Sequence, residues 1–375
     1  MKTPIIIMIF SILILIGGLT FFITQPNIIM PADPILGVKT EETQSNEQDD
    51  LENEIPDFSI KLKQASSSAL LSIPKYMSQT FNNCGPANLA MILNFWGENF
   101  TQEKIGEDLR PFNTPNGGVD DKSVYNNEMA AYAKQNGYES IVRPNGTIEK
   151  LKLFTSNGIP VVVSAWLHKN EDIGHYRLVK GFDENRKVIL TDDSYIGPNQ
   201  TLAYEEFNDL WKPFNYTYLI IYPAEKSAIV NEILGSEVDQ NISYQNAIKV
   251  ALDDLTKNPN DTYAQFNIAT SNYYLGNFAE SARIYEQVSR KLPPRMLWYQ
   301  YEPILAYQQI GEDQKAISAA DTLLNNANLA FSEMYQLKGE IYLKQGNKEL
   351  AKDMFEKALF YNKNYDKPKE SLKNL

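Results

Sequence analysis

The sequence predicts an α+β domain followed by an all-α repeat solenoid, with a single membrane-spanning helix in front of both. Three observations indicate this order. An uncharged apolar run occupies residues 4–24, helix-type and strand-type patterns follow one another over residues 61–225, and residues 244–366 are mostly helical and repeat every 34 or 35 residues. A chain of 375 residues has room for two such domains.

The apolar run at residues 4–24 follows Lys2 and is long enough to span a bilayer, which takes about 20 helical residues. A cleaved signal peptide usually has a shorter apolar region and a small-x-small cleavage site, and no good site precedes Pro26. We therefore expect residues 1–25 to be an uncleaved anchor, with signal cleavage and secretion as the alternative. Residues 41–57 contain eight acidic residues and no basic one, so the positive-inside rule predicts a cytoplasmic N-terminus and an extracytoplasmic body.

Residues 26–60 mix proline, glycine, amides and acidic side chains without periodicity, which predicts a disordered acidic linker.

The composition of the chain argues against several classes of function. The net charge of −12 and the lack of a dense Lys/Arg cluster argue against nucleic-acid binding. The single cysteine excludes an intramolecular disulfide and a cysteine-based zinc cluster, and two histidines make a His-rich metal site improbable. We expect neither a metal nor a cofactor.

The single cysteine, Cys84, directly precedes Gly85-Pro86 and an apolar run. Proline is tolerated in the first turn of a helix, where its missing N–H costs no hydrogen bond, so a helix should begin here. Unpaired N–H groups and the helix dipole at that end favour an anion, and therefore a cysteine thiolate. A lone cysteine is more often a small core residue, so the other residues of the segment must decide between a core role and a nucleophile.

A β-hairpin is predicted from His175 onward, because strand-type runs flank a polar Asp-Glu-Asn-Arg turn. If that turn is a four-residue loop, Phe182 pairs with Lys187. Asp192 then becomes the diagonal neighbour of His175 on the same face of the hairpin, and Asp193 points to the other face. A β-bulge would reverse this choice, so Asp193 stays open as the rival of Asp192.

Gln79 completes a set of groups that could transfer an acyl group. Its amide can donate to a developing oxyanion beside the backbone N–H of Cys84. Cys84 would be the nucleophile, His175 the general base, and an aspartate at the end of the hairpin the group that orients the imidazole. The second histidine, His168, is expected to be a surface-loop residue.

The segments "YMSQTFNNCGPANLAMILNFWG" and "GHYRLVKGFDENRKVILTDD" resemble the papain-like bacteriocin-processing peptidases, in their broader stand-alone peptidase C39-like branch. The resemblance covers about residues 70–222. It implies a papain-like cysteine peptidase fold, in which an N-terminal helix carrying the cysteine precedes an antiparallel sheet carrying the histidine.

The resemblance also implies roles at four positions of this chain. Cys84 would be the nucleophile, His175 the general base and acid, Asp192 the orienting carboxylate and Gln79 the oxyanion-hole donor. Thr-Asp-Asp stands where the family has Asn-Asp-Pro, which keeps Asp193 in competition with Asp192.

Small residues recur through the C-terminal third of the chain. Gly276, Gly311 and Gly346 are each 35 residues apart, and the stretch "YQLKGEIYLKQGNKELAKDMFEKALFYN" resembles a tetratricopeptide repeat. Pro303 should kink or shorten the first helix of the second repeat. The expected layout is a linker at 226–243, a lone helix at 244–257, repeats near 262–295, 297–330 and 332–365, and a domain that extends from 244 to 375.

A repeat solenoid of this kind offers a concave surface for a peptide or a partner protein, although a purely stabilising appendage is the alternative. By family position, five residues are expected to face that groove: Tyr273, Tyr274, Gln308, Gln309 and Lys344.

Together these features predict a membrane-tethered extracytoplasmic cysteine peptidase. It would hydrolyse peptide bonds, and its repeats would dock a peptide substrate or a protein partner. The alternative is a catalytically inactive papain-like and repeat scaffold for protein–protein interaction.

Overall fold

The computed structural model leaves the N-terminal segment undescribed, so the predicted anchor at 4–24 and linker at 26–60 lie outside the described residues. None of the described helices is both long enough and apolar enough to cross a membrane. All described residues belong to one compact unit, Phe58–Leu375. The structure describes residues 62–112, 123–326 and 328–375.

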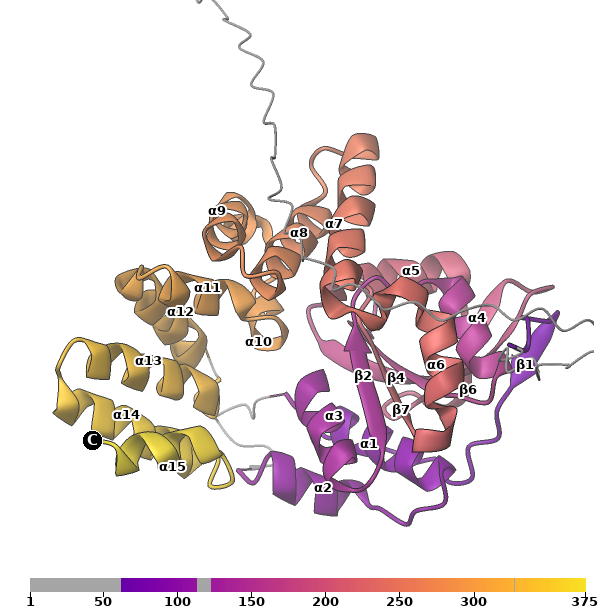
Figure 1. The fold of residues 1–375 in the computed structure, drawn as a ribbon, viewed down its shortest axis with the longest axis horizontal. Helices are drawn as coiled ribbons and strands as arrows, with labels where there is room; N and C mark the ends of the chain where they lie inside the picture. The colour runs from indigo at the N-terminus through magenta and orange to yellow at the C-terminus, as the bar shows by residue number, and fades with distance from the viewer. Residues whose placement is uncertain (1–61, 113–122, 327) are drawn as a thin grey trace, which may run out of the picture. The chain divides into compact units, whose positions relative to one another are not determined.

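In the described part of the chain, seven strands form one antiparallel sheet (Figure 1). Their order is β2-β7-β3-β4-β5-β6, and β1 pairs with the C-terminal end of β4. The strands are β1 (Ser68–Leu70), β2 (Glu139–Arg143), β3 (Val161–Trp166), β4 (Gly174–Asp183), β5 (Val188–Asp193), β6 (Gly197–Ala203) and β7 (Tyr218–Tyr222).

Each face of the sheet has its own hydrophobic core, because side chains alternate along a strand. Val162 and Leu219 pack with α1, α2 and α3 on one face. Val161 and Val163 pack with α4, α5 and α6 on the other. These helices are α1 (Cys84–Phe95), α2 (Gln102–Leu109), α3 (Asn126–Gln135), α4 (Ile148–Ser156), α5 (Tyr204–Trp211) and α6 (Ser227–Leu234).

Helix α1 is buried from Gly85 to Asn94 and begins at Cys84. Pro86 lies in its first turn, as the sequence predicts. Gly85 permits close packing, because a Cβ there would lie 3.0 Å from the Cβ of Val124. Cys84 is therefore held at the N-terminus of a helix that is fixed by its surroundings.

The rest of the described chain is helical. Pairs α8–α9, α11–α12 and α13–α14 match the three predicted repeats, and Gly276, Gly311 and Gly346 end the first helix of each pair with φ of +79°, +78° and +79°. Only glycine adopts this conformation without strain, which explains the 35-residue period. The helices are α7 (Gln240–Lys257), α8 (Thr262–Tyr274), α9 (Phe278–Val288), α10 (Met296–Tyr299), α11 (Glu302–Gln309), α12 (Asp313–Asn325), α13 (Ser332–Lys344), α14 (Lys348–Tyr361) and α15 (Asp366–Lys373), with 3-10 turns η1 (Lys212–Phe214), η2 (Ala224–Lys226), η3 (Gly235–Val238) and η4 (Ser289–Lys291).

One expectation for this region needs correction, and the expectation for Pro303 is confirmed in one of its two forms. Residues 226–243 do not form an extended linker, because α6 and η3 lie there and bury Val230 and Leu234 in the core beneath the sheet. Pro303 was expected to kink or shorten the first helix of the second repeat, and that helix is the shorter one, with 8 residues against 13 in α8 and α13. Pro303 lies in the first turn of α11, and the preceding residues form the separate short helix α10.

The repeats pack directly on the α+β part through a shared core. Trp166 at the end of β3 packs edge-on against Phe214, with ring centroids 4.7 Å apart, and both belong to the core that fills the repeats. The amide Nε2 of Gln300 donates to the carbonyl of Pro213 at 2.8 Å. Tyr125 at the start of α3 donates its hydroxyl to the carbonyl of Trp298 at 2.9 Å.

Candidate active site

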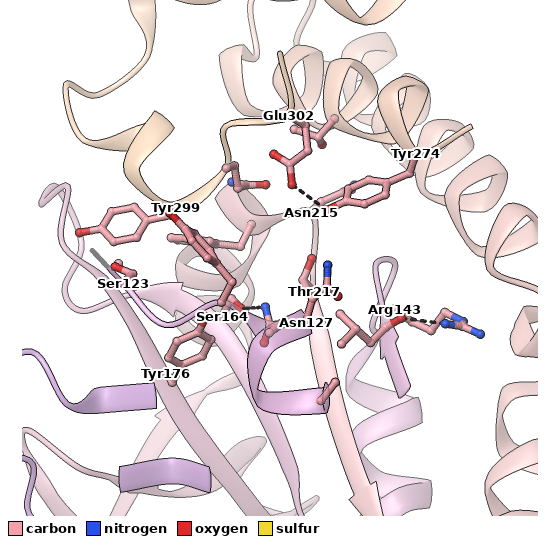
Figure 2. A pocket seen from close by; sticks show the side chains of 18 of the residues that line it. Ser123, Asn127, Arg143, Ser164, Tyr176, Asn215, Thr217, Tyr274, Tyr299 and Glu302 are labelled. Atoms are coloured by element: carbon pink, nitrogen blue, oxygen red, sulfur yellow. Dashed lines mark hydrogen bonds between the residues drawn. The ribbon is translucent and has the colours of Figure 1, made fainter. Parts of the chain in front are cut away.

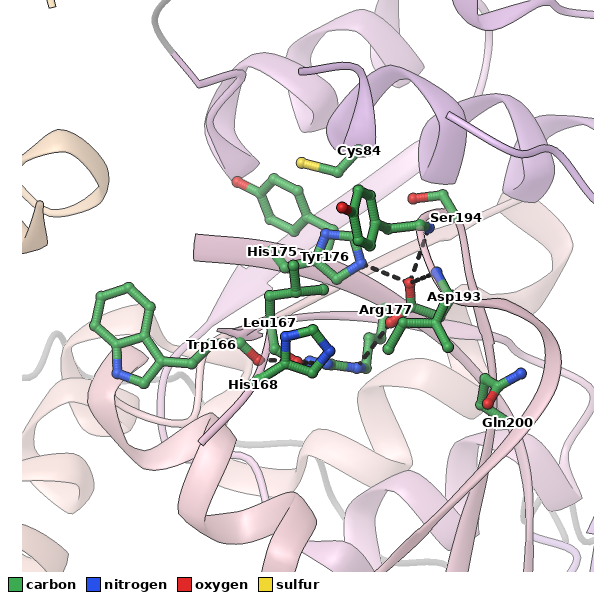
Figure 3. A network of polar contacts seen from close by, with 12 residues as sticks. Cys84, Trp166, Leu167, His168, His175, Tyr176, Arg177, Asp193, Ser194 and Gln200 are labelled. Carbon is green, nitrogen blue, oxygen red and sulfur yellow. Dashed lines mark hydrogen bonds and ion pairs between the residues drawn. The ribbon is translucent and has the colours of Figure 1, made fainter. Parts of the chain in front are cut away.

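Three elements bring Cys84, His175 and Asp193 together (Figure 3). Cys84 is the first residue of α1, His175 lies at the start of β4 and Asp193 ends β5. His175 Nε2 donates to Asp193 Oδ1 at 2.8 Å, and both side chains are buried. The imidazole lies between the carboxylate of Asp193 and the side chain of Cys84.

His175 is hydrogen-bonded to the carboxylate of Asp193, which the sequence left as the rival of Asp192, and not to Asp192, the residue preferred for this position. In the β4–β5 pairing, Arg177 is opposite Asp193 and Leu178 is opposite Asp192. Asp192 therefore faces away from His175. Its Oδ1 accepts from Lys180 Nζ at 2.6 Å and from a backbone N–H at 2.8 Å.

A β-bulge causes the difference. The turn pairs Asp183 with Val188, whereas the expected register pairs Phe182 with Lys187. This difference shifts the pairing by two residues, and a shift by an even number leaves every side chain on its expected face of the sheet. The register then shifts by one between Val179 and Gly181, and this single step exchanges the faces of Asp192 and Asp193.

Gly181 is the sequence signal that could have located the bulge, since an isolated glycine in a strand often marks one. Strand β1 crosses close to this position. A Cβ on Gly181 would lie 2.1 Å from the carbonyl oxygen of Ala69. Only glycine fits here without moving β1.

Asp193 is held by several groups besides His175. The Nε of Arg177 lies 3.0 Å from its Oδ2, and the backbone N–H groups of Tyr195 and Ile196 each donate to Oδ1 at 2.9 Å. Arg177 is itself 2% exposed, and its guanidinium donates to the carbonyl of Trp166 at 2.8 Å. These contacts fix the carboxylate that orients the imidazole.

These contacts shift the pKa values of both Asp193 and His175. Burial alone would raise the pKa of Asp193, but the hydrogen bond from His175 and the charges of His175 and Arg177 outweigh it, and the pKa falls to about 2. Burial alone would lower the pKa of His175, but its hydrogen bonds to Asp193 and Cys84 outweigh it, and the pKa is raised above 6.5. The site therefore stabilises a protonated imidazole beside the cysteine.

This geometry can be compared with known proteins. Residues 71–219 match the model of the Peptidase_C39 like family. The resemblance predicted from the sequence is confirmed, and the helical region after this C39-like domain matches the predicted repeats.

Among solved structures, a C39-like peptidase from Bacillus anthracis is 16% identical, with a TM-score of 0.33 over 42% of this chain and 98% of that one. The peptidase domain of Streptococcus ComA, a bi-functional ABC transporter, is 20% identical, with a TM-score of 0.31 over 40% and 99%. A thermophilic TPR protein from Thermus thermophilus is 18% identical, with a TM-score of 0.28 over 35% and 72%. No curated protein matches the chain.

Gln79 lies beside the end of β5 in the C39-like domain. Its backbone N–H donates to the carbonyl of Ser194 at 2.8 Å, and the hydroxyl of Ser194 donates to Gln79 Oε1 at 2.9 Å. The oxygen of the amide is thus occupied, which leaves Nε2 as the free donor. The role of Gln79 at an oxyanion stays a prediction.

Sequence reasoning missed three buried polar residues that assemble this site: Asn88, Arg177 and Ser194. Asn88 Nδ2 donates to the carbonyls of Cys84 at 2.8 Å and Tyr176 at 3.2 Å, and so joins α1 to β4. The available signal was a polar residue within an otherwise apolar element, because a fully buried polar group needs partners. His168 lies outside the site, is half exposed and contacts Glu171 at 3.0 Å.

Cys84 and His175 line a cavity of about 580 Å³ whose walls come from both parts of the chain. Figure 2 shows Ser164 and Tyr176 of the C39-like domain lining it together with Tyr274, Tyr299 and Glu302 of the repeats. The repeats therefore form part of the wall around the cysteine.

Tyr299 of the repeats lies against the strand that carries His175. A Cβ on Gly174 would lie 2.7 Å from the Tyr299 ring, and Gly174 directly precedes His175.

Of the five residues predicted to face the repeat groove, Tyr274 lines this cavity. The others lie elsewhere: Tyr273 packs against Phe278 with ring centroids 5.4 Å apart, Gln308 donates to Glu340 at 2.7 Å, Lys344 pairs with Asp313 at 3.3 Å, and Gln309 is exposed. Part of the repeat surface is occupied by the chain itself, because Tyr125 packs against Tyr301 with centroids 5.2 Å apart.

Proposed function

We propose that this protein is a cysteine peptidase that hydrolyses peptide bonds with Cys84, His175 and Asp193. One observation carries the proposal. A buried imidazole is hydrogen-bonded to a carboxylate at 2.8 Å on one side and faces the side chain of the only cysteine on the other. This is the arrangement that activates a thiol for nucleophilic attack.

The reaction begins when Cys84 transfers its proton to His175 and its sulfur attacks the carbonyl carbon of the scissile peptide. The C–S bond forms, and the resulting oxyanion accepts hydrogen bonds from the backbone N–H of Cys84 and from Gln79 Nε2. The C–N bond then breaks, and His175 gives its proton to the leaving amine.

Water completes the cycle. It gives a proton to His175 and attacks the thioester carbon, the C–S bond breaks, and the sulfur recovers the proton as the acid product leaves. Asp193 keeps its negative charge throughout, because its pKa of about 2 lies far below neutral pH. Its role is to orient the imidazole and to stabilise its protonated form.

We further propose that the repeats dock a peptide or protein substrate. Tyr274 and Tyr299 line the same cavity as Cys84, so a chain segment bound there would contact both domains. On this proposal the repeats take part in recognising the segment that contains the scissile bond.

The same proposal includes a membrane anchor at residues 4–24 and an extracytoplasmic body, supported by the apolar run and the acidic stretch after it. Expression of the full chain in bacteria, followed by carbonate extraction of membranes and protease treatment of spheroplasts, tests both points. Retention in the membrane with digestion from outside supports them. Release of a shortened chain into the medium favours signal cleavage.

A peptide-library digest with the full chain tests the peptidase proposal. We expect cleavage by the wild-type protein and none by Cys84→Ala. Intact peptides in both reactions, with both proteins folded, would favour the inactive scaffold.

A further inference from the structure

The repeats bring one acidic side chain into the cavity around Cys84. It belongs to Glu302, the first residue of α11. Figure 2 shows Glu302 beside Tyr274, on the side of the cavity that the repeats form. The peptidase mechanism does not use this carboxylate, so its presence in the cavity needs another explanation.

Glu302 has few partners for a carboxylate. The hydroxyl of Tyr274 donates to Oε1 at 2.8 Å. Oε2 is shielded from solvent and receives no hydrogen bond from another residue of the described chain. Burial raises the pKa of Glu302. A carboxylate in this state gains most from a positively charged group that enters the cavity.

The lysine and the arginine that line the cavity do not supply that charge, and the imidazole of His175 is paired with Asp193. The guanidinium of Arg143 donates to the carbonyls of Glu237 at 2.8 Å and Val238 at 2.6 Å. Lys134 is exposed in the last turn of α3. Neither forms an ion pair with Glu302 in the part of the chain that the structure describes.

Three tyrosines of the helical region line the same cavity as this carboxylate. Tyr244 and Tyr274 stack with ring centroids 4.5 Å apart and an interplanar angle of 8°, and both line the cavity, as Tyr299 does. The face of an aromatic ring attracts a cation, and a carboxylate beside such rings makes a site suited to an ammonium group.

We propose that Glu302 and these tyrosines bind a protonated amine of the substrate peptide, either a lysine side chain or a free amino terminus. The inference rests on the proposed function, because it names the kind of substrate that reaches Cys84. It makes the repeats a specificity-determining wall of the active site, with a preference for a cationic group at one fixed distance from the scissile bond.

The test measures binding of short peptides to the full chain carrying Cys84→Ala, which removes the nucleophile and leaves the cavity intact. The probes are fluorescent hexapeptides of alanine and glycine with one lysine at each position in turn. Each has a partner with norleucine in place of lysine, and each is made with a free and with an acetylated amino terminus. Fluorescence polarisation gives the dissociation constants.

We expect one member of the set to bind about tenfold more tightly, or more, than its uncharged partner, since a hydrogen bond to a charged group is worth that much. A preference for lysine over norleucine identifies the side chain as the source. A preference for the free over the acetylated peptide identifies the amino terminus. Glu302→Gln, which keeps the size of the side chain, should abolish the preference.

Glu349→Gln is the matched control, because it removes one negative charge from an exposed position on α14. It should leave the preference unchanged. Equal affinity for charged and uncharged partners at every position, absence of binding by all of them, or a preference that survives Glu302→Gln would overturn the inference. The peptide comparison needs no change at Glu302, so it decides the matter even if that variant does not fold.

The outcome is separable from that of the peptidase proposal. Binding to the Cys84→Ala chain requires no catalysis. Cys84-dependent cleavage without any preference for an amine contradicts this inference alone. A clear preference for an amine without cleavage by the wild-type chain contradicts the proposed reaction alone.

Discussion

His175 Nε2 lies 2.8 Å from Oδ1 of Asp193, while the adjacent Asp192 binds Lys180 at 2.6 Å. Two neighbouring aspartates thus have separate tasks on opposite faces of β5. The distinction can be tested directly, because either residue can be changed without touching the other's partner.

Asp193→Ala should lower kcat/KM by about a hundredfold or more, since the imidazole loses the group that orients it and stabilises its charge. Asp192→Ala should keep kcat/KM within about threefold of wild type, because its contacts lie on the other face of the sheet. Peptide hydrolysis by the two variants, with thermal melts to verify folding, makes the comparison. A larger loss for Asp192→Ala would contradict the assignment.

Arg177→Met should destabilise the fold by about 3–5 kcal/mol, because it removes the guanidinium that is paired with Oδ2 of the buried Asp193 carboxylate. Denaturant unfolding of the full chain measures this cost. Arg186→Ala is the control: this exposed arginine in the β4–β5 turn should change stability by no more than about 0.5 kcal/mol. Equal effects of the two changes would mean that Arg177 does not support the site.

Stability should depend on pH through the same pair. The pKa of Asp193 falls from 3.8 to about 2 on folding, so its contribution of about 2 kcal/mol is present above pH 3.8 and is lost as the pH falls towards 2. The pKa of His175 is raised above 6.5, so its contribution is present below pH 6.5 and is lost as the pH rises through the folded value.

Unfolding free energies of wild type and Asp193→Asn, measured from pH 2 to pH 8, test this dependence. The difference between them should be largest between about pH 4 and pH 6.5 and should shrink on the acidic side. A difference that is constant down to pH 2 would show that the carboxylate titrates normally.

Gly174→Ala should reduce kcat/KM, because the added Cβ would lie 2.7 Å from the Tyr299 ring and must displace it or the strand that carries His175. Overpacking of this kind costs about 1–3 kcal/mol. Replacing the ring as well, in Gly174→Ala/Tyr299→Ala, should remove the clash and recover part of the stability that Gly174→Ala loses. Additive losses in the double variant would argue against a direct contact.

Much of the fold could be predicted from patterns within short stretches of the sequence. Pro86 correctly located the start of the helix at Cys84, and the glycines at 276, 311 and 346 correctly located three helix pairs. These features depend on backbone conformations that proline and glycine impose within a few residues of themselves. Cys84 and His175 could be paired because each lies at the end of a clearly patterned element.

Contacts between residues that are far apart in the sequence could not be predicted from such short-range patterns. The exchange of Asp192 for Asp193 depends on a bulge beside β1, a strand more than a hundred residues away in the sequence. The approach of Tyr299 to Gly174, and the helices in place of a linker at 226–243, depend on which surfaces meet in the folded chain. No periodic pattern in the sequence predicts those contacts.

The central claim is that His175 activates Cys84, and the alkylation rate of that cysteine by iodoacetamide tests it most directly. Cys84 is the only thiol in the chain, so incorporation reports on it alone. We predict that near neutral pH the wild-type protein reacts about tenfold faster, or more, than His175→Ala. Equal rates for the two proteins, both at the rate of a free cysteine, would contradict the account.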